Sequence, residues 1–175
     1  MGSDAMSRTF IRQLLGELND ELALKSETGE LYLVGGAVMC LVFDARATTR
    51  DVDAYYRPVE HLRAAATRVG ARHDLPENWL NDAVRGYLSD RGEFTSYLGL
   101  SHLQVFSPTP EYLLAMKAMA MRLGAEFRDE RDVRFLLRLL DVRTVAAAMA
   151  IVTSFHPHER IPVKTALALE ELLGE

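Results

Sequence analysis

The strongest constraint on the fold is an apolar stretch that ends in two glycines and leads, after a polar loop, into a second strand-like stretch. The first stretch is Leu31–Val34, and Gly35-Gly36 follows it directly. A continuous apolar strand is usually covered on both faces, so we expect this one inside a sheet. The two glycines allow a tight turn, and the apolar residues from Ala37 to Phe43 predict a short helix.

The second stretch places two acids on one side of a strand that we expect over Asp51–Tyr56. Three of its residues are expected to face the core: Val52, Ala54 and Tyr56. Because strand side chains alternate between faces, Asp51 and Asp53 should point the same way, roughly 7 Å apart. Mg²⁺ takes oxygen ligands from one or two carboxylates plus substrate phosphates, so the pair suits phosphate chemistry. The alternative is a solvent-facing strand whose acids pair with Arg50 or Arg57.

The surroundings of the acid pair favour the metal interpretation. Two acids one residue apart on a strand repel each other, and a bound cation removes most of that cost. The Gly-Gly turn after the preceding strand and the polar run Thr48-Thr49-Arg50 just before the acids add polar groups that suit a phosphate. We therefore treat this region as the candidate site.

Val34-Gly35-Gly36-Ala37, Arg46, Thr48 and Asp51-Val52-Asp53 together resemble the first motif of the polymerase-β-like nucleotidyltransferase superfamily. The chain is similar in particular to small bacterial proteins of the AbiEii/MenA toxin-like group. The resemblance implies a nucleoside triphosphate facing Gly35, Gly36, Thr48 and Arg50, with Mg²⁺ or Mn²⁺ held by Asp51 and Asp53. It also implies transfer of a nucleoside monophosphate to a hydroxyl of an RNA end, such as a tRNA end, or of a protein. A toxin-like role with a cognate antitoxin would be consistent with this group.

The second half of the chain extends the resemblance through Lys117, Arg122 and the run Arg128-Asp129-Glu-Arg-Asp132. Lys117 lies at helical spacing among apolar residues, where a lysine either extends past its neighbours to solvent or meets an anion in a cleft. The resemblance implies the cleft. Asp129 is interpreted as a helix cap, whereas Asp132 suits a cap and a catalytic carboxylate equally. Arg122 suits a bound phosphate or a surface ion pair.

One departure from the superfamily concerns a third carboxylate, which the resemblance implies on a later strand. The segment His102–Phe106 has Gln104 where an acid is expected, and glutamine cannot act as a general base. Four acids elsewhere are candidates for the missing group: Asp82, Asp90, Glu93 and Asp132. The alternative function is therefore a catalytically impaired protein that keeps the fold and binds a nucleotide or a partner.

The pattern along the chain predicts an α/β (α+β) fold, with a small mixed sheet followed by a C-terminal helical bundle. We expect a nucleotidyltransferase-like core over 7–108 and a helical region over 109–175. Besides the segments above, helices are expected over these ranges: 10–24, 58–69, 75–88, 111–124, 129–140, 144–155 and 163–173. Two further strands are expected over 94–98 and 102–106, and Trp79 is expected in the core. Asn81 could cap a turn or line the cleft, and the pattern slightly favours the cap.

Composition limits the remaining possibilities. The 175 residues carry a net charge of −5, which argues against broad nonspecific binding to nucleic acid. No apolar run reaches the roughly 18 residues of a membrane span, so we expect no membrane partner and a cytoplasmic location. The single Cys40 excludes an internal disulfide and is expected to be buried. Met1–Ala5 is left out of the fold prediction, with Met6 expected as the natural first residue.

Overall fold

The computed structural model describes residues 5–82, 84, 86, 88–122 and 129–174. Contacts divide the chain into two compact units. The α/β unit comprises Met1–Arg85 and Phe94–Ser107, and the helical unit comprises Gly86–Glu93 and Pro108–Glu175. The helical unit therefore contains a segment, 86–93, that lies before the predicted boundary at residue 108.

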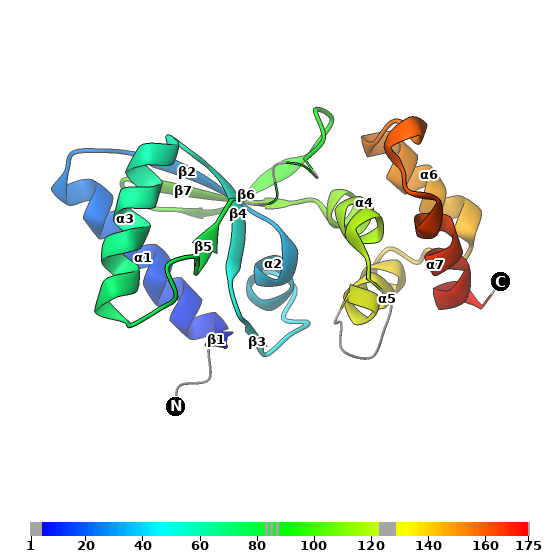
Figure 1. Cartoon of the computed structure of the whole chain (residues 1–175), viewed down its shortest axis with the longest axis horizontal. Helices are drawn as coiled ribbons and strands as arrows, with labels where there is room; N and C mark the ends of the chain where they lie inside the picture. Colours follow the sequence, from blue (N-terminus) through cyan, green and yellow to red (C-terminus); the bar gives the residue numbers. More distant parts are fainter. Residues whose placement is uncertain (1–4, 83, 85, 87, 123–128, 175) are drawn as a thin grey trace. The chain divides into compact units, whose positions relative to one another are not determined.

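The α/β unit is built on a mixed five-stranded sheet in the order β5-β4-β2-β7-β6 (Figure 1). Its strands are β2 (Gly29–Leu33), β4 (Val52–Arg57), β5 (Leu80–Asn81), β6 (Phe94–Gly99) and β7 (Leu103–Pro108). β2 runs antiparallel to β4 and parallel to β7, while β5 runs parallel to β4. A second, two-stranded sheet pairs β1 (Met6–Ser7) with β3 (Thr48–Thr49). The mixed α/β architecture predicted from the sequence is confirmed.

One face of the five-stranded sheet forms the core of the α/β unit. Its fully buried side chains come from alternate positions of three strands: Leu31, Leu33, Val52, Ala54, Leu103 and Val105. The helices α1 (Arg8–Leu24) and α3 (Val59–Arg72) pack on each other and contribute the opposing apolar side chains, while α2 (Gly35–Leu41) packs beside β4. Trp79 and Cys40 are buried as expected, and the Trp79 indole N–H donates to the carbonyl of Ala66 at 3.0 Å.

The opposite sheet face carries polar and aromatic side chains in cross-strand rows. Tyr32 of β2 lies opposite Tyr55 of β4 and Phe106 of β7, and its ring centroid is 4.6 Å from that of Phe106. Phe94 contacts the Tyr32 ring edge-on at 5.1 Å. In the next row, Glu30 lies between Arg57 and Gln104. All of these residues except Arg57 and Gln104 are half-buried, so this face is only partly shielded.

The helix predicted over 75–88 is wrong for residues 75–82. A turn begins after Pro76, where the Trp79 N–H donates to the Pro76 carbonyl at 3.0 Å, and Leu80–Asn81 then forms β5. The Val52 N–H donates to the Trp79 carbonyl at 2.7 Å. Pairing with the sheet edge therefore satisfies backbone groups that would otherwise bond within a helix. Asn81 therefore lies in a strand and is no turn cap. Residues 83, 85 and 87 of the predicted helix lie outside the described residues.

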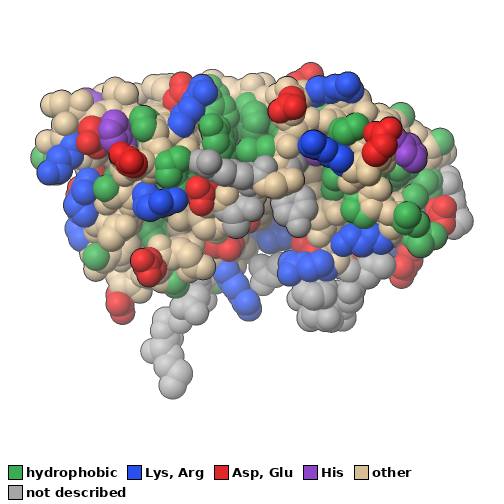
Figure 2. Space-filling model, turned by 45° about the horizontal axis from the view of Figure 1, so that its top comes forward, with side chains coloured by type: hydrophobic (Ala, Val, Ile, Leu, Met, Phe, Trp, Pro, Cys, Tyr) green, Lys and Arg blue, Asp and Glu red, His purple; other side chains and the backbone are tan. Residues whose placement is uncertain are grey.

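The helical unit centres on α4 (Pro110–Ala120), which contacts α5 (Asp129–Leu139), α6 (Val145–Phe155) and α7 (Val163–Leu173). Threonines cap two of these helices: the Thr109 hydroxyl accepts from the Tyr112 N–H, and that of Thr144 from the Ala147 N–H. Among the described residues, no helix combines the length and the apolar character needed to cross a membrane. Lys and Arg side chains intermingle with Asp and Glu over the face seen in Figure 2.

Candidate functional site

The Gly-Gly turn lies directly against one of the two acids. Gly35 has φ +63°, a left-handed conformation that side-chain-bearing residues rarely adopt. A Cβ at this position would lie 2.8 Å from Asp53 Oδ2, which is closer than a carbon and an oxygen can approach without movement. The Val34 N–H donates to the Asp53 carbonyl at 2.9 Å and fixes the start of the turn on β4. Position 35 thus requires glycine for its backbone angle and for its contact with Asp53.

Asp53 lies on the side of β4 that faces away from the core, and Asp51 directly precedes the strand, which begins at Val52 and not at the predicted Asp51. Val52 and Ala54 are fully buried, while Asp51 and Asp53 on either side of Val52 are half-buried. This alternation confirms the prediction that Val52, Ala54 and Tyr56 face inward. The carboxylate oxygens of the two acids are hard ligands of the kind that Mg²⁺ prefers. The Asp53 carboxylate lies directly against the glycine turn, where a Gly35 Cβ would be 2.8 Å from Oδ2.

The second glycine lies against Arg46 and Thr49. A Cβ on Gly36 would lie 2.9 Å from both Arg46 Nη1 and Thr49 Oγ1. Thr49 is buried, and its hydroxyl donates to the Asp51 carbonyl at 3.2 Å, so it links the turn to the acid pair. The resemblance predicts Thr48 and Arg50 as the nucleotide contacts here. Thr48 pairs with Ser7 across the small sheet, and Arg50 is exposed.

Gln104 is not beside the acid pair. It lies opposite Glu30 on β7, and its side-chain amide donates to the Leu100 carbonyl at 2.9 Å. Of the four acids considered for the third carboxylate, only Asp82 belongs to the α/β unit. It follows Asn81, the register partner of Asp53 on β5, and forms an ion pair with Arg63 at 3.7 Å. Within the described ranges, no cluster of three or more His, Cys, Asp or Glu residues could hold a metal ion.

Lys117 and Asp132 lie together in the helical unit. Lys117 Nζ is 2.6 Å from Asp132 Oδ2, and the two side chains are 10% and 3% exposed. The pair joins α4 to α5. The sequence analysis considered solvent or an anion for Lys117, and a cap or a catalytic role for Asp132. It did not predict that the two residues bond each other, because nothing in helical spacing shows which faces of two helices meet.

The remaining predicted phosphate ligand, Arg122, also has a carboxylate partner. Its backbone N–H and its Nε both donate to Asp129 Oδ2, at 3.1 and 2.9 Å, while its side chain is 62% exposed. This is the surface ion pair that the sequence analysis gave as one of two possibilities. Arg128 lies outside the described residues.

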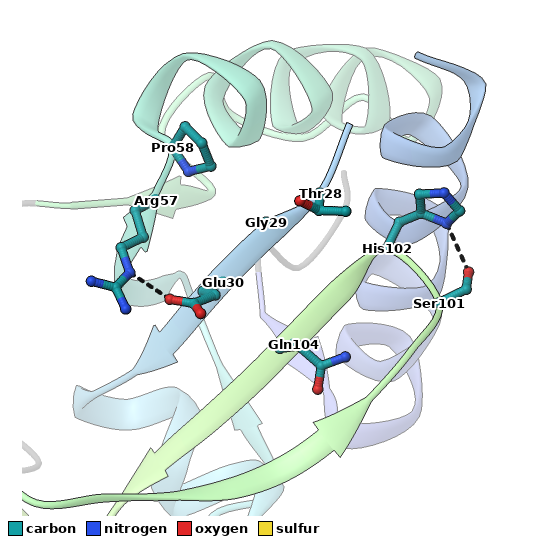
Figure 3. Close-up of a pocket in the computed structure, with 8 residues that line it drawn as sticks. All are labelled: Thr28, Gly29, Glu30, Arg57, Pro58, Ser101, His102 and Gln104. Atoms are coloured by element: carbon teal, nitrogen blue, oxygen red, sulfur yellow. Dashed lines mark hydrogen bonds and ion pairs between the residues drawn. The ribbon is translucent and has the colours of Figure 1, made fainter. Parts of the chain in front are cut away.

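A cavity of about 460 Å³ lies on the polar sheet face of the α/β unit (Figure 3). Arg57 and Glu30 point toward each other along one wall, and Ser101 donates to or accepts from His102 Nδ1 at 2.9 Å on the other. The Arg57 hydrogen bond lowers the pKa of the Glu30 carboxyl, which stays ionised. Arg57 is four residues from Asp53 on β4, or about 13 Å along the strand. The sequence analysis did not identify this cavity.

Comparison of the chain with protein-family models, with curated proteins and with solved structures found no match.

Proposed function

We propose that this chain is a Mg²⁺- or Mn²⁺-dependent nucleotidyltransferase that moves a nucleoside monophosphate from a nucleoside triphosphate to a hydroxyl acceptor. The observation that carries the proposal is the contact between the left-handed Gly35 and the Asp53 carboxylate. It places the first turn of α2, whose initial N–H groups have no carbonyl partner within the helix, against the half-buried Asp53 of β4, and Asp51 lies two residues before it. Such a combination suits a phosphate group and its cation.

In this proposal Asp51 and Asp53 hold the cation, which when bound neutralises phosphate charge and orients the triphosphate. The N–H groups of Gly35 and Gly36 bind phosphate oxygens, with Thr48 and Arg50 as further nucleotide contacts. The acceptor oxygen forms a bond to the α-phosphorus, the bond from that phosphorus to the bridging oxygen breaks, and pyrophosphate leaves. We propose that Asp82 takes the hydroxyl proton, because it is the one of the four candidate acids that belongs to the same unit as the acid pair.

The resemblance also assigns Lys117, Asp132 and Arg122 to this reaction, and these roles stay predictions. Within the helical unit, Lys117 Nζ lies 2.6 Å from Asp132 Oδ2, and Arg122 pairs with Asp129. The acceptor is a hydroxyl of an RNA end, including that of tRNA, or of a protein side chain. A cognate antitoxin is the proposed regulatory partner.

The test combines binding with transfer. Each of the four nucleoside triphosphates, with Mg²⁺ or Mn²⁺, is expected to raise the melting temperature of the protein. Incubation with α-labelled triphosphates and a mixture of RNA or protein acceptors should then label one acceptor. Asp51→Asn and Asp53→Asn should each reduce labelling by at least about 10²-fold, as expected when a single electrostatic stabiliser is removed. Asp141→Asn, at a side chain 75% exposed in the helical unit, is the matched control.

Two results would overturn the proposal: failure of every triphosphate to bind with either cation, or labelling that survives both substitutions. The alternative function, a catalytically impaired nucleotide- or partner-binding protein, is favoured by the position of Gln104 beside Glu30 instead of an acid beside Asp53. It predicts cation-dependent binding of a triphosphate without transfer. If the alternative holds, Asp82→Asn should leave the rise in melting temperature caused by the triphosphate and cation unchanged.

A further inference from the structure

A second cavity, of about 190 Å³, lies entirely within the helical unit. Two segments form it: 89–91, and the region from the end of α6 to the short 3-10 helix His158–Arg160. Its lining residues are Ser89, Asp90, Arg91, Phe155, His156, Pro157 and Arg160. The volume is below the roughly 300–1,000 Å³ of pockets that bind drug-sized molecules, so the cavity suits a single small group.

Hydrogen bonds hold the two walls of this cavity together. The Ser89 hydroxyl donates to the Phe155 carbonyl, and it also accepts from the Arg91 N–H at 3.1 Å. The Ser89 N–H donates to Tyr112 Oη at 2.8 Å, and the Tyr112 ring contacts that of Phe155 with centroids 5.0 Å apart. The cavity is therefore formed before any ligand binds, which reduces the entropy that binding costs.

Positive charge is left uncompensated around the cavity. Within the described ranges, the guanidinium groups of Arg91 and Arg160 form no ion pair or hydrogen bond with another side chain. The one carboxylate of the lining, Asp90, pairs with neither of them within the 4 Å of an ion pair. Unpaired arginines that share a small cavity are suited to a phosphate, because guanidinium N–H groups match its oxygens in charge and geometry.

His156 adds a buried polar group without a partner. His156 is one of the residues that line the cavity and is 4% exposed, and its buried Nε2 lacks a hydrogen-bond partner among the described residues. Buried polar atoms without partners are rare and costly in native proteins. Burial, and then the charge of Arg160, lowers the pKa of the imidazole, so the ring is neutral at pH 7. An anion beside it would offset the charge of Arg160 and favour a protonated, hydrogen-bond-donating ring.

We propose that this cavity is a phosphate-binding site, formed by Arg91 and Arg160, with His156 next to the bound anion. Its ligand is one phosphate group, either as the free ion or as the terminal phosphate of an RNA. The site is independent of the proposed nucleotidyl transfer, since none of its residues has a role in that reaction.

The first test is a titration of the full chain with inorganic phosphate at constant ionic strength. Binding is monitored by calorimetry and by the imidazole NMR signals of His156. Saturable binding should shift these signals, and Arg91→Gln or Arg160→Gln should weaken it by at least about tenfold. Asp90→Asn should tighten it, since a repelling carboxylate is removed. Arg138→Gln, at an exposed position of α5, is the matched control and should bind as the wild type does.

The second test distinguishes the two sources of the phosphate. A short RNA with a 5′-phosphate is compared with the same RNA carrying a 5′-hydroxyl. Tighter binding of the phosphorylated RNA, lost in Arg160→Gln, assigns the site to an RNA end, while equal binding of both RNAs assigns it to the free ion. The proposal is overturned if phosphate leaves the His156 signals unmoved, or if Arg138→Gln weakens binding as much as Arg91→Gln. Circular dichroism verifies that each variant is folded.

Discussion

The charged side chains of the two units differ in how much of their surface is exposed to solvent. In the helical unit, Lys117 and Asp132 form an ion pair whose side chains are 10% and 3% exposed. In the α/β unit, the pair of Arg57 and Glu30 keeps 57% and 37% of its side chains exposed. The acids Asp51 and Asp53 are half-buried.

This difference separates two roles for charged residues. A buried pair loses much if one partner is removed, because the other is left without water or a counter-charge. Exposed pairs contribute little to stability. We therefore expect substitutions at the helical pair to act mainly on stability, and those around the Gly-Gly turn to act on both stability and binding.

The largest expected effect is at the buried pair. Lys117→Met leaves the Asp132 carboxylate buried without its cation and should lower the free energy of unfolding by about 3–5 kcal/mol. Urea denaturation measures this. The double variant with Asp132→Asn removes the buried negative charge as well and should recover part of the lost unfolding free energy. A loss below about 1 kcal/mol in the single variant would show that the pair is hydrated, and the contrast between the units would fail.

The second largest change in unfolding free energy is expected at the Gly-Gly turn. Gly35→Ala forces a side chain into a left-handed conformation and against Asp53 Oδ2, and should cost about 2–3 kcal/mol of unfolding free energy. Cation-dependent binding of triphosphates should fall with it. Gly16→Ala is the control, since its Cβ meets no atom within 4 Å and it lies inside α1, and this variant should gain about 0.5–1 kcal/mol. If both variants behaved alike, the contact with Asp53 would be irrelevant.

A smaller effect, with a defined pH dependence, is expected where α1 meets α3. Hydrogen bonds from Arg72 and then Arg68 lower the pKa of the Glu21 carboxyl below its ordinary 4.5. Because the folded pKa is the lower one, the stabilisation is present above pH 4.5 and disappears as the pH falls through the folded value. Glu21→Gln should therefore cost about 1–2 kcal/mol at pH 7, and this cost should shrink progressively as the pH falls below 4.5.

Thermal unfolding of the Glu21→Gln variant across pH 3–8 tests this, with Glu171→Gln on an exposed position of α7 as the control. A destabilisation that stayed constant over the whole range would mean that packing, and not the charge of Glu21, accounts for the effect.

The smallest expected change lies on the polar sheet face. The Tyr32 hydroxyl donates to Glu30 at 2.9 Å and accepts from Arg57 at 3.1 Å. Tyr32→Phe keeps the contact with Phe106 but removes both bonds, and should cost about 0.5–1 kcal/mol and raise the pKa of Glu30. NMR titration of the Glu30 carboxyl measures the second effect. An unchanged pKa of Glu30 would indicate that Arg57, without Tyr32, lowers the pKa of this carboxyl.

Much of the fold follows from short-range patterns. The helices α1, α3, α6 and α7 and the strand β4 appear close to where apolar spacing predicts them. The exception is the segment after α3, where Trp79 and Leu80 suit a helix and a buried strand equally well. Its backbone bonds to Val52 decided the outcome, and such a partner distant in the sequence cannot be read from local spacing.

For the candidate site too, some features could be predicted from the sequence and others could not. The sequence by itself determined that Val52 and Ala54 face the core and that a glycine turn precedes the acids, because alternation and backbone freedom depend on neighbouring residues alone. Only the tertiary structure decided that Lys117 bonds Asp132, that Asn81 lies opposite Asp53, and that two unpaired arginines share a cavity. These contacts depend on which surfaces pack together, and packing is set by the whole fold.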